Sequence, residues 1–468
     1  MRSVNTLPDD VLLAVFDYYV NDDAYHLTER EETWQSLVHV CRRWRCIIFA
    51  SPRHLNLQLV CTTGTRARDR LDVWPALPLI IWCNEIGSVD NINAVLERRD
   101  RVCQIRLWNV ESSDLEIILA AMQQPFPELT YLLLRGDSMG ETVPVAPNSF
   151  LGGSAPRLEY LQLNGIPFPG LPKLFLSATH LVDLRLLNIP HSGYISPEEM
   201  VTALSALTSL RGLTLRFQSP RSFPHQASRR PPPSTRSILL VLTFQFKGVS
   251  DYLEDLVARI DAPRLSILKI TFFNDTVFDT PQFIQFISRT PVSRELHKAH
   301  FTLRNREAGL GLSSRTSGVK IFSVNILCQG LDWQLSSLEQ VCTSCLPPLS
   351  MLEDLYTYED PYSPPDWKDD IENEPWLQLL HSFAAVKNLY LSEQSAQRIG
   401  PALQDLAEGR TTEVLPALQN IFLEGLESSG PVQEGIGKLV AARQVASRPI
   451  VVSSWANSDS DKDYYYDA

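Results

Sequence analysis

The stretch Leu158-Glu159-Tyr160-Leu161-Gln162-Leu163 carries the pattern that decides the fold, Leu-x-x-Leu-x-Leu. The pattern recurs with successive starts 27, 29, 23 and 29 residues apart, at Val102, Leu129, Leu158, Leu181 and Leu210. It continues at Leu265, Val386 and Leu418, and less regular candidates lie around Ile238, Leu296, Val319 and Leu352. Self-similarity at this period is typical of leucine-rich repeats.

Amphipathic helical patterns lie between the predicted strands, for example Leu115, Ile118, Leu119 and Met122. One strand–helix unit cannot bury its own apolar strand face, so the leucines of neighbouring units stack into one core. The sequence therefore predicts an α/β fold, a leucine-rich-repeat solenoid over residues 77–456 with a parallel concave sheet. We expect it to be irregular, because Val110, Ile166 and Ile189 stand where such repeats usually carry Asn or Cys.

The N-terminal 60 residues have a different, helical pattern. Thr6 is a suitable N-cap, Pro8 suits a first helical position, and Asp9 and Asp10 favour the first turn. A second apolar stripe runs from Trp34 to Ile48 and predicts a second helix. Two such helices bury little surface by themselves, so part of their apolar face needs a partner or the following domain.

The motifs Leu7-Pro8-x-Asp10-Val11-Leu12-Leu13-x-Val15-Phe16 and Leu37-x-x-Val40-Cys41-Arg42-x-Trp44, followed by Pro52, resemble an F-box. With the repeats, the chain is similar to the leucine-rich-repeat class of F-box proteins, particularly the divergent, expanded fungal kind. The resemblance implies a surface that binds the Skp-type adaptor of cullin–RING ubiquitin ligases. Its adaptor-binding and core positions would be Leu7, Pro8, Val11, Leu12, Phe16, Val40, Cys41, Trp44 and Ile47.

The function that this resemblance implies is that of a non-catalytic substrate receptor of an SCF-type E3 ubiquitin ligase. The module would hold the adaptor and the repeat arc would hold a target protein. The alternative is a leucine-rich-repeat interaction scaffold whose N-terminal helices only cap the solenoid. Burial distinguishes the two, because a cap would turn Leu7, Phe16 and Trp44 into the repeats.

Composition narrows the partners. A formal net charge of −12 argues against general binding to nucleic acid or anionic membranes, which depends on positive charge. No apolar run approaches the ~20 residues of a membrane span, and the N-terminus lacks the apolar core of a signal peptide. We therefore expect protein partners and a cytoplasmic or nuclear location. The eight scattered cysteines suit reduced thiols better than a disulfide framework.

Several segments interrupt the repeat pattern. Residues 61–76 are polar and predict a linker between the module and the repeats. Loop insertions are predicted near 218–237, which is rich in Pro and Arg, near 304–318, which is rich in Gly and Ser, and near 359–375, which is acidic. Residues 457–468 form an acidic tail, in which Ser458 and Ser460 are candidates for phosphorylation.

No catalytic, cofactor-binding or metal-ligating motif stands out. Cys342-x-x-Cys345 lies on a helical stripe with Leu338 and Val341, so a buried core is favoured over a metal or redox site. His39 has no evident nucleophile or acid beside it. We therefore expect no enzyme activity, no cofactor and no metal.

The strand alternation points to a candidate substrate-binding surface. If the repeated leucines face the core, the residues between them face the concave side. Arg and aromatic side chains are enriched there, and both are typical of binding hot spots. One hypothesis is a site for an acidic or phosphorylated segment; the other is an ordinary mixed-charge strand face. The candidate residues are Arg106, Trp108, Tyr131, Arg135, Tyr160, Arg185 and Arg216.

Overall fold

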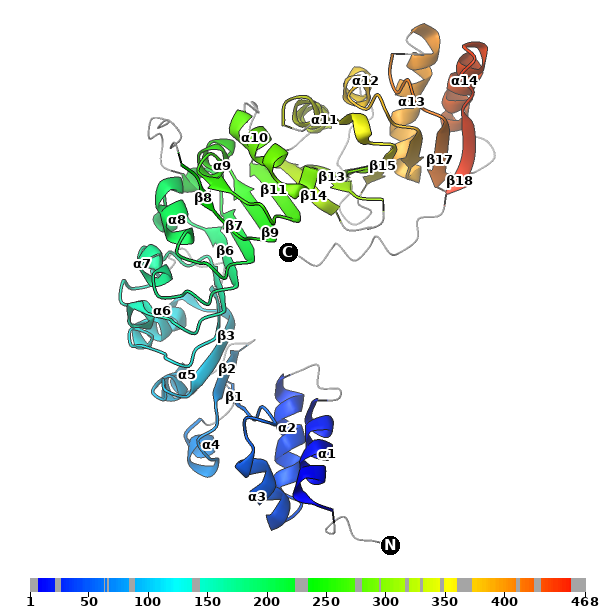
Figure 1. The fold of residues 1–468 in the computed structure, drawn as a ribbon. Helices are drawn as coiled ribbons and strands as arrows, with labels where there is room; N and C mark the ends of the chain where they lie inside the picture. The colour runs from blue at the N-terminus through cyan, green and yellow to red at the C-terminus, as the bar shows by residue number, and fades with distance from the viewer. Residues whose placement is uncertain are drawn as a thin grey trace. The chain divides into compact units, whose positions relative to one another are not determined.

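The computed structural model describes residues 7–21, 27–62, 64, 67–83, 89–136, 144–223, 235–273, 280–293, 296–315, 320–328, 331–345, 349–359, 373–409, 413–424 and 431–455. Mostly parallel strands alternate with helices, which confirms the predicted α/β leucine-rich-repeat-like solenoid (Figure 1). The chain divides into two units. Unit 1 comprises Met1–Ile195 and Thr202–Leu210, and unit 2 comprises Ser196–Val201 and Arg211–Ala468.

Unit 1 begins with three helices, α1 (Asp9–Asn21), α2 (Leu27–Val38) and α3 (Arg42–Ala50). The second predicted helix is therefore wrong in one respect, because it is broken between Val38 and Arg42. Cys41 has an extended backbone, and its Sγ accepts a hydrogen bond from the Trp44 amide at 3.4 Å. Cys41 thus caps the start of α3 and separates it from α2.

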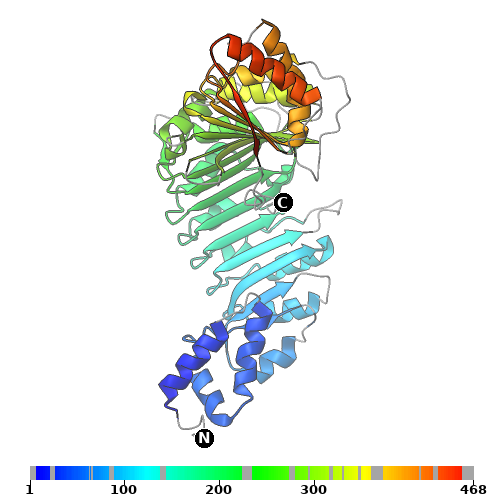
Figure 2. The same ribbon diagram turned by 90° about the vertical axis from the view of Figure 1, so that its right-hand side faces the viewer.

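In the described part of unit 1, six parallel strands follow in sequential order (Figure 2). They are β1 (Leu59–Cys61), β2 (Leu79–Cys83), β3 (Val102–Val110), β4 (Tyr131–Gly136), β5 (Tyr160–Asn164) and β6 (Asp183–Ile189). The repeated leucines form the core as predicted; Leu132, Leu161 and Leu184, which pair in register, are fully buried. The helices between the strands are α4 (Ala67–Val73), α5 (Val89–Leu96), α6 (Ser112–Ala121) and α7 (Leu171–Phe175). Helix α8 (Pro197–Leu204) belongs partly to each unit.

The predicted linker at residues 61–76 is structured at its described residues, 61–62, 64 and 67–76. Cys61 ends β1, whose three residues are all buried and pair with Leu79–Ile81 of β2. Helix α4 follows at Ala67–Val73, and Ala67 is buried. The polar composition of this segment thus reflects the exposed face of a short helix rather than an unstructured connection.

Among the described residues of unit 2, ten strands belong to the main sheet, in the order β7-β9-β11-β14-β13-β12-β15-β16-β17-β18. The first half comprises β7 (Gly212–Phe217), β9 (Thr243–Gly248), β11 (Ile267–Phe273), β14 (Lys320–Leu327) and β13 (Glu307–Ser313). The second half comprises β12 (Lys298–Arg304), β15 (Asp354–Glu359), β16 (Asn388–Leu391), β17 (Asn420–Glu424) and β18 (Val451–Trp455). All neighbours pair in parallel except that β13 runs antiparallel to both β12 and β14.

One face of this sheet carries the helices of unit 2 (Figure 1). They are α9 (Ser250–Val257), α10 (Pro281–Arg289), α11 (Leu331–Gln340), α12 (Glu374–His381), α13 (Glu393–Gly409) and α14 (Pro431–Val445). A separate pair of short strands, β8 (Ser237–Ile238) and β10 (Ile260–Asp261), is also parallel. The irregular repeat candidate around Ile238 therefore lies in this small pair and not in the main sheet.

The predicted loop near 304–318 is wrong, because it contains β13. Leu310 and Leu312 point into the core, whereas Gly309 and Gly311 lie on the other face. A Cβ at Gly309 would lie 2.5 Å from Asn325 Oδ1, and one at Gly311 would lie 2.6 Å from Lys320 Cδ. The glycines that suggested a loop are needed because neighbouring side chains cross directly over the strand.

The other predicted insertions fall mostly outside the described residues. Of 218–237, the structure describes 218–223, with a 3₁₀ turn at Pro220–Ser222, and 235–237. Of 359–375 it describes only 359 and 373–375. Residues 457–468 and Val319 lie wholly outside the described part of the chain.

Candidate functional site

The predicted adaptor-binding residues separate into an exposed group and a core group. Leu7, Val11 and Val40 are 37%, 40% and 59% exposed, and Pro8 is exposed as well. Val15, one helical turn beyond Val11, is 51% exposed. Leu7, which lies just before α1, and Val11 and Val15 on α1 follow one another at intervals of four residues, and we call them the α1 stripe.

The remaining predicted residues hold the three helices together. Leu12, Phe16 and Ile47 are buried, while Cys41 and Trp44 are half-buried. The rings of Phe16 and Trp44 lie with centroids 4.7 Å apart. Because Phe16 and Trp44 pack on each other across α1 and α3, they form the interior of the helical module.

A different aromatic cluster joins the module to the first repeat. Trp34 is 1% exposed, and its Nε1–H donates to the carbonyl of Gln58 at 3.2 Å. Its ring lies edge-on to that of Trp74, with the ring centroids 5.2 Å apart. The ring centroids of Phe49 and Trp74 are 6.3 Å apart. The attachment thus uses α2, the end of α3 and the residue that follows α4, and it leaves the α1 stripe exposed.

Four of the predicted substrate-binding residues lie together on the sheet of unit 1. Tyr131 and Tyr160 pair in register on β4 and β5, and their rings stack in parallel with centroids 4.2 Å apart. The Arg106 guanidinium carbon lies 4.3 Å from the Tyr131 ring centroid, and that of Arg185 lies 5.5 Å from Tyr160. We call Arg106, Tyr131, Tyr160 and Arg185 the Arg–Tyr row; a cation lies over each end of the tyrosine stack.

Neighbouring polar groups hold this row in place. Arg106 donates to Gln104 Oε1 at 3.0 Å, and the Tyr160 hydroxyl donates to Gln162 Oε1 at 2.6 Å. Arg185 pairs with Asp183 at 3.1 Å. Burial, followed by the nearby Tyr131, raises the pKa of Tyr160 above its usual value of 10.0, so this hydroxyl stays neutral and able to donate.

The other three candidates are not part of this row. Arg216 lies in unit 2, where its Nη2 donates to Gln245 Oε1 at 2.9 Å. Trp108 is half-buried at the irregular end of β3, where Asn109 adopts φ 51°. Arg135 is half-buried near the end of β4. The structure therefore reduces the predicted set in unit 1 to a compact group of two arginines and two tyrosines.

A second aromatic array, which the sequence analysis missed, lies on unit 2. Four rings from neighbouring strands in register stack on one another, with centroid separations of 4.8, 4.2 and 4.5 Å, and we call them the aromatic ladder. Its members are His300, Tyr356, Tyr390 and Phe422. Trp455 lies across it, 6.0 Å from Tyr356 and 5.6 Å from Tyr390, with its plane tilted by 61° and 69°. The available signal was the residue that follows the second apolar position of each motif, which is aromatic in β15, β16 and β17.

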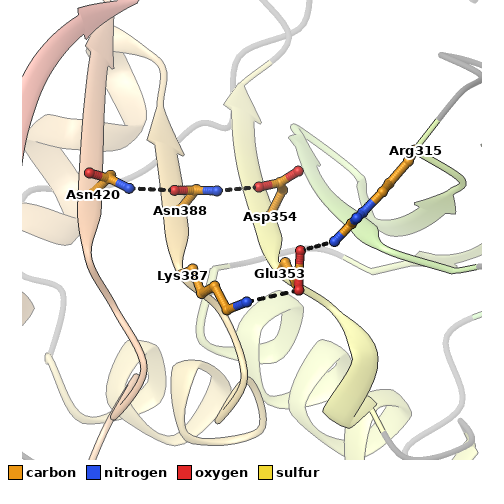
Figure 3. Close-up of polar contacts among 6 residues, drawn as sticks. All are labelled: Arg315, Glu353, Asp354, Lys387, Asn388 and Asn420. Atoms are coloured by element: carbon orange, nitrogen blue, oxygen red, sulfur yellow. Dashed lines mark hydrogen bonds and ion pairs between the residues drawn. The ribbon is translucent and has the colours of Figure 1, made fainter.

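Polar side chains run alongside the ladder. Asn420 Nδ2 donates to Asn388 Oδ1 at 2.7 Å, and Asn388 Nδ2 donates to Asp354 Oδ1 at 2.6 Å (Figure 3). Beside this chain of amides, Glu353 pairs with Lys387 at 2.9 Å and also with Arg315. The hydrogen bond from Lys387, together with Arg315, holds the pKa of Glu353 below its usual value. The network fixes three successive strands at their N-terminal ends.

The candidate chemical groups from the sequence are placed as follows. The Cys342 side chain is buried, and the Cys345 side chain lies outside the described residues. His39 is exposed, with its ring 6.1 Å from that of Trp74. In the described part of the chain, no group of three or more His, Cys, Asp or Glu side chains is arranged to hold a metal ion. Among the described helices, none combines the length and apolar character needed to cross a bilayer.

No protein-family model and no curated protein matches the sequence. Among solved structures, the leucine-rich repeat-containing protein LegL7 from Legionella pneumophila is similar over 82% of this chain and 97% of its own, with 15% identity and a TM-score of 0.27. The assignment as a leucine-rich-repeat-like protein rests on this chain's own repeated strands and their register.

Proposed function

We propose that the chain is a leucine-rich-repeat scaffold that binds protein partners and supplies no chemistry of its own. The observation that carries this proposal is the Arg–Tyr row, a half-buried group of two arginines and two stacked tyrosines on the sheet face. Arg and Tyr are enriched at energetic centres of protein interfaces. Guanidinium groups at both ends of the stack favour an acidic or phosphorylated segment of the partner.

The finer form of the proposal is a substrate-recognition subunit of an SCF-type ubiquitin ligase. Two observations support it. The N-terminal sequence resembles an F-box, and the α1 stripe stays exposed although the module is already attached through Trp34, Phe49 and Trp74. Helices that served only as a cap would have no use for an apolar surface that remains exposed.

In this role the chain would act by proximity. The adaptor on the α1 stripe would connect the chain to the ligase, and the repeats would hold the target within reach of the ubiquitin-charged enzyme. Such a reaction takes place in the cytoplasm or nucleus, in keeping with the location expected from the sequence. No cofactor or metal is required of this chain.

Co-expression with a Skp-type adaptor tests the finer proposal. The wild-type chain should co-purify with the adaptor in a 1:1 ratio. The double variant Val11→Asp, Val15→Asp should lose the adaptor and remain folded, because both side chains are largely exposed. Val73→Asp is the matched control, since Val73 is 74% exposed on α4, and it should retain the adaptor. If the wild type captures no adaptor, the module is a cap, and the scaffold proposal stands without the ligase.

A further inference from the structure

Helices α9–α14 cover one face of the sheet of unit 2 (Figure 1). The residues on the opposite face change from small and basic on one side to aromatic on the other. A single row in register crosses seven strands, from β11 to β17. It begins with small and basic residues and ends with the aromatic ladder. Its members, in spatial order, are Lys269, Ser323, Gly311, His300, Tyr356, Tyr390 and Phe422.

Lysine ammonium groups gather on the first half of this face. Lys320 passes over Gly311, and its Nζ donates to Thr302 Oγ1 at 3.5 Å. Lys298 Nζ lies 6.0 Å from the Tyr356 ring centroid. After burial, these two lysines are the charges that lower the pKa of His300, to about 3, so both lie close to the same ring. The positive charge is notable in a chain with a formal net charge of −12.

Carboxylates on this face are engaged with neighbours. Asp354 accepts the amide of Asn388 at 2.6 Å, and Glu307 pairs with Arg304 at 3.4 Å. With Lys298, Lys320 and Lys269 nearby, the half of the face over β11, β14 and β12 keeps an excess of positive charge. Such a surface attracts acidic segments, over a distance set by the ionic strength.

The last described strand, β18, ends on the aromatic half of the face. Trp455 is the last residue of β18, and its ring lies 5.9 Å from Tyr358 as well as against Tyr356 and Tyr390. The end of the last strand is thereby fixed on the ladder side of the sheet. The next residues start from this point.

We propose that this face binds the chain's own acidic segment, residues 456–468, with the aspartates on the lysines of β11, β12 and β14. The segment lies outside the described residues, and its sequence contains four Asp and one Lys. Strands are about 4.8 Å apart, so Lys298 on β12 lies ~19 Å and Lys320 on β14 ~29 Å from β18. The residues Asp459 to Asp463 lie ~13–29 Å of extended chain beyond Trp455, which matches this span.

The segment would then compete with any external acidic ligand for the same surface. Attachment to Trp455 gives it an effective concentration on the order of millimolar, so a free ligand must bind much more tightly to displace it. Phosphorylation of Ser458 or Ser460 would add about −1.5 to −2 charges each and strengthen the competition. This inference does not depend on the adaptor or on the Arg–Tyr row.

A labelled peptide with the sequence of residues 456–468 tests the inference by fluorescence anisotropy. The full-length chain with Asp459, Asp461, Asp463 and Asp467 changed to Asn should bind this peptide at least tenfold more tightly than the wild type, whose own segment occupies the face. Adding both Lys298→Glu and Lys320→Glu to this chain should weaken its affinity for the peptide at least tenfold. Adding Lys438→Glu on α14, which pairs with Glu434 within its own helix, is the matched control and should change little.

A charge-swapped peptide separates specific binding from misfolding. The Lys298→Glu, Lys320→Glu chain should bind a peptide in which the four Asp are replaced by Lys, and the parent chain should not. The inference is overturned if the Asp→Asn chain does not bind the natural peptide. The inference is also overturned if the natural peptide binds equally well to the chain with both Lys298→Glu and Lys320→Glu and to the chain with Lys438→Glu. The peptide would then bind elsewhere.

Discussion

Tyr131 and Tyr160 stack face to face across neighbouring strands, with parallel rings and centroids 4.2 Å apart. Each ring also carries an arginine, Arg106 on one side and Arg185 on the other. Since the rings shield each other's faces, a ligand would meet their edges, the hydroxyls and the two guanidinium groups. The stack therefore holds two guanidinium groups, one at each end, of which that of Arg185 is paired with Asp183.

Reversing these two charges should weaken partner binding. The double variant Arg106→Glu, Arg185→Glu should capture at least tenfold less of the partner proteins that the wild-type chain captures. A tenfold loss of affinity corresponds to about 1.4 kcal/mol of binding free energy. Quantitative mass spectrometry of affinity-purified complexes measures the loss. Arg157→Glu is the control, because Arg157 lies outside the strands and pairs with Glu128. Unchanged capture by the double variant would remove the Arg–Tyr row as a binding site.

Removing the Trp34 ring should destabilise the attachment of the N-terminal module. Trp34 is 1% exposed and contacts both Phe49 and Trp74, so Trp34→Ala leaves a large cavity. We expect unfolding of unit 1 to become easier by about 3–5 kcal/mol, as measured by urea denaturation. The change Tyr19→Ala on α1 should cost within about 0.5 kcal/mol, because this side chain is 56% exposed. Similar values for the two variants would mean that Trp34 does not anchor the module.

His300 should make unit 2 sensitive to acid. Burial, with Lys320 and Lys298, lowers the pKa of His300 from 6.5 to about 3, so the folded chain keeps a neutral ring that the unfolded chain protonates below pH 6.5. Its contribution to stability is therefore complete above pH 6.5 and is lost progressively as the pH falls towards 3.

The variant His300→Phe keeps an aromatic ring in the ladder and removes the titration. Its free energy of unfolding should fall less steeply than that of the wild type between pH 6.5 and 4, although Ser313 loses its partner at 3.0 Å and lowers the value at neutral pH. Chemical denaturation at a series of pH values measures both slopes. Parallel slopes would show that His300 is not held neutral in the folded chain.

The sequence predicted well those features that depend on periodic burial. Leu158, Leu161 and Leu163 are buried as their spacing requires, and the alternate positions of β4 and β5 bring Tyr131 and Tyr160 together. Spacing alone could not show that Arg216 belongs to the other unit, because the division depends on how densely the repeats contact one another.

Other features depend on contacts between distant residues and were missed. Gly309 and Gly311 suggested a loop, but each makes room for a side chain of β14, Asn325 or Lys320. The aromatic ladder could not be predicted, because its rings come from repeats with irregular spacing. Only the register of the strands shows that Tyr356 and Tyr390 stack. The break at Cys41 depends on a thiol acting as a helix cap, which propensity does not anticipate.

The strand order β11-β14-β13-β12-β15 governs how unit 2 can be completed during synthesis. The edge of β11 must wait for β14, which begins 47 residues after β11 ends, from Phe273 to Lys320 (320 − 273). At about 5–20 residues per second, a ribosome needs roughly 2–9 s to supply them. Strands β1 to β6 can each join the one before as they emerge, whereas β11 presents an unpaired edge to the surrounding cell for seconds. Because β13 is antiparallel and is inserted between β14 and β12, strands join the sheet one after another up to β11, and the next strand can join only after β14 has been synthesised.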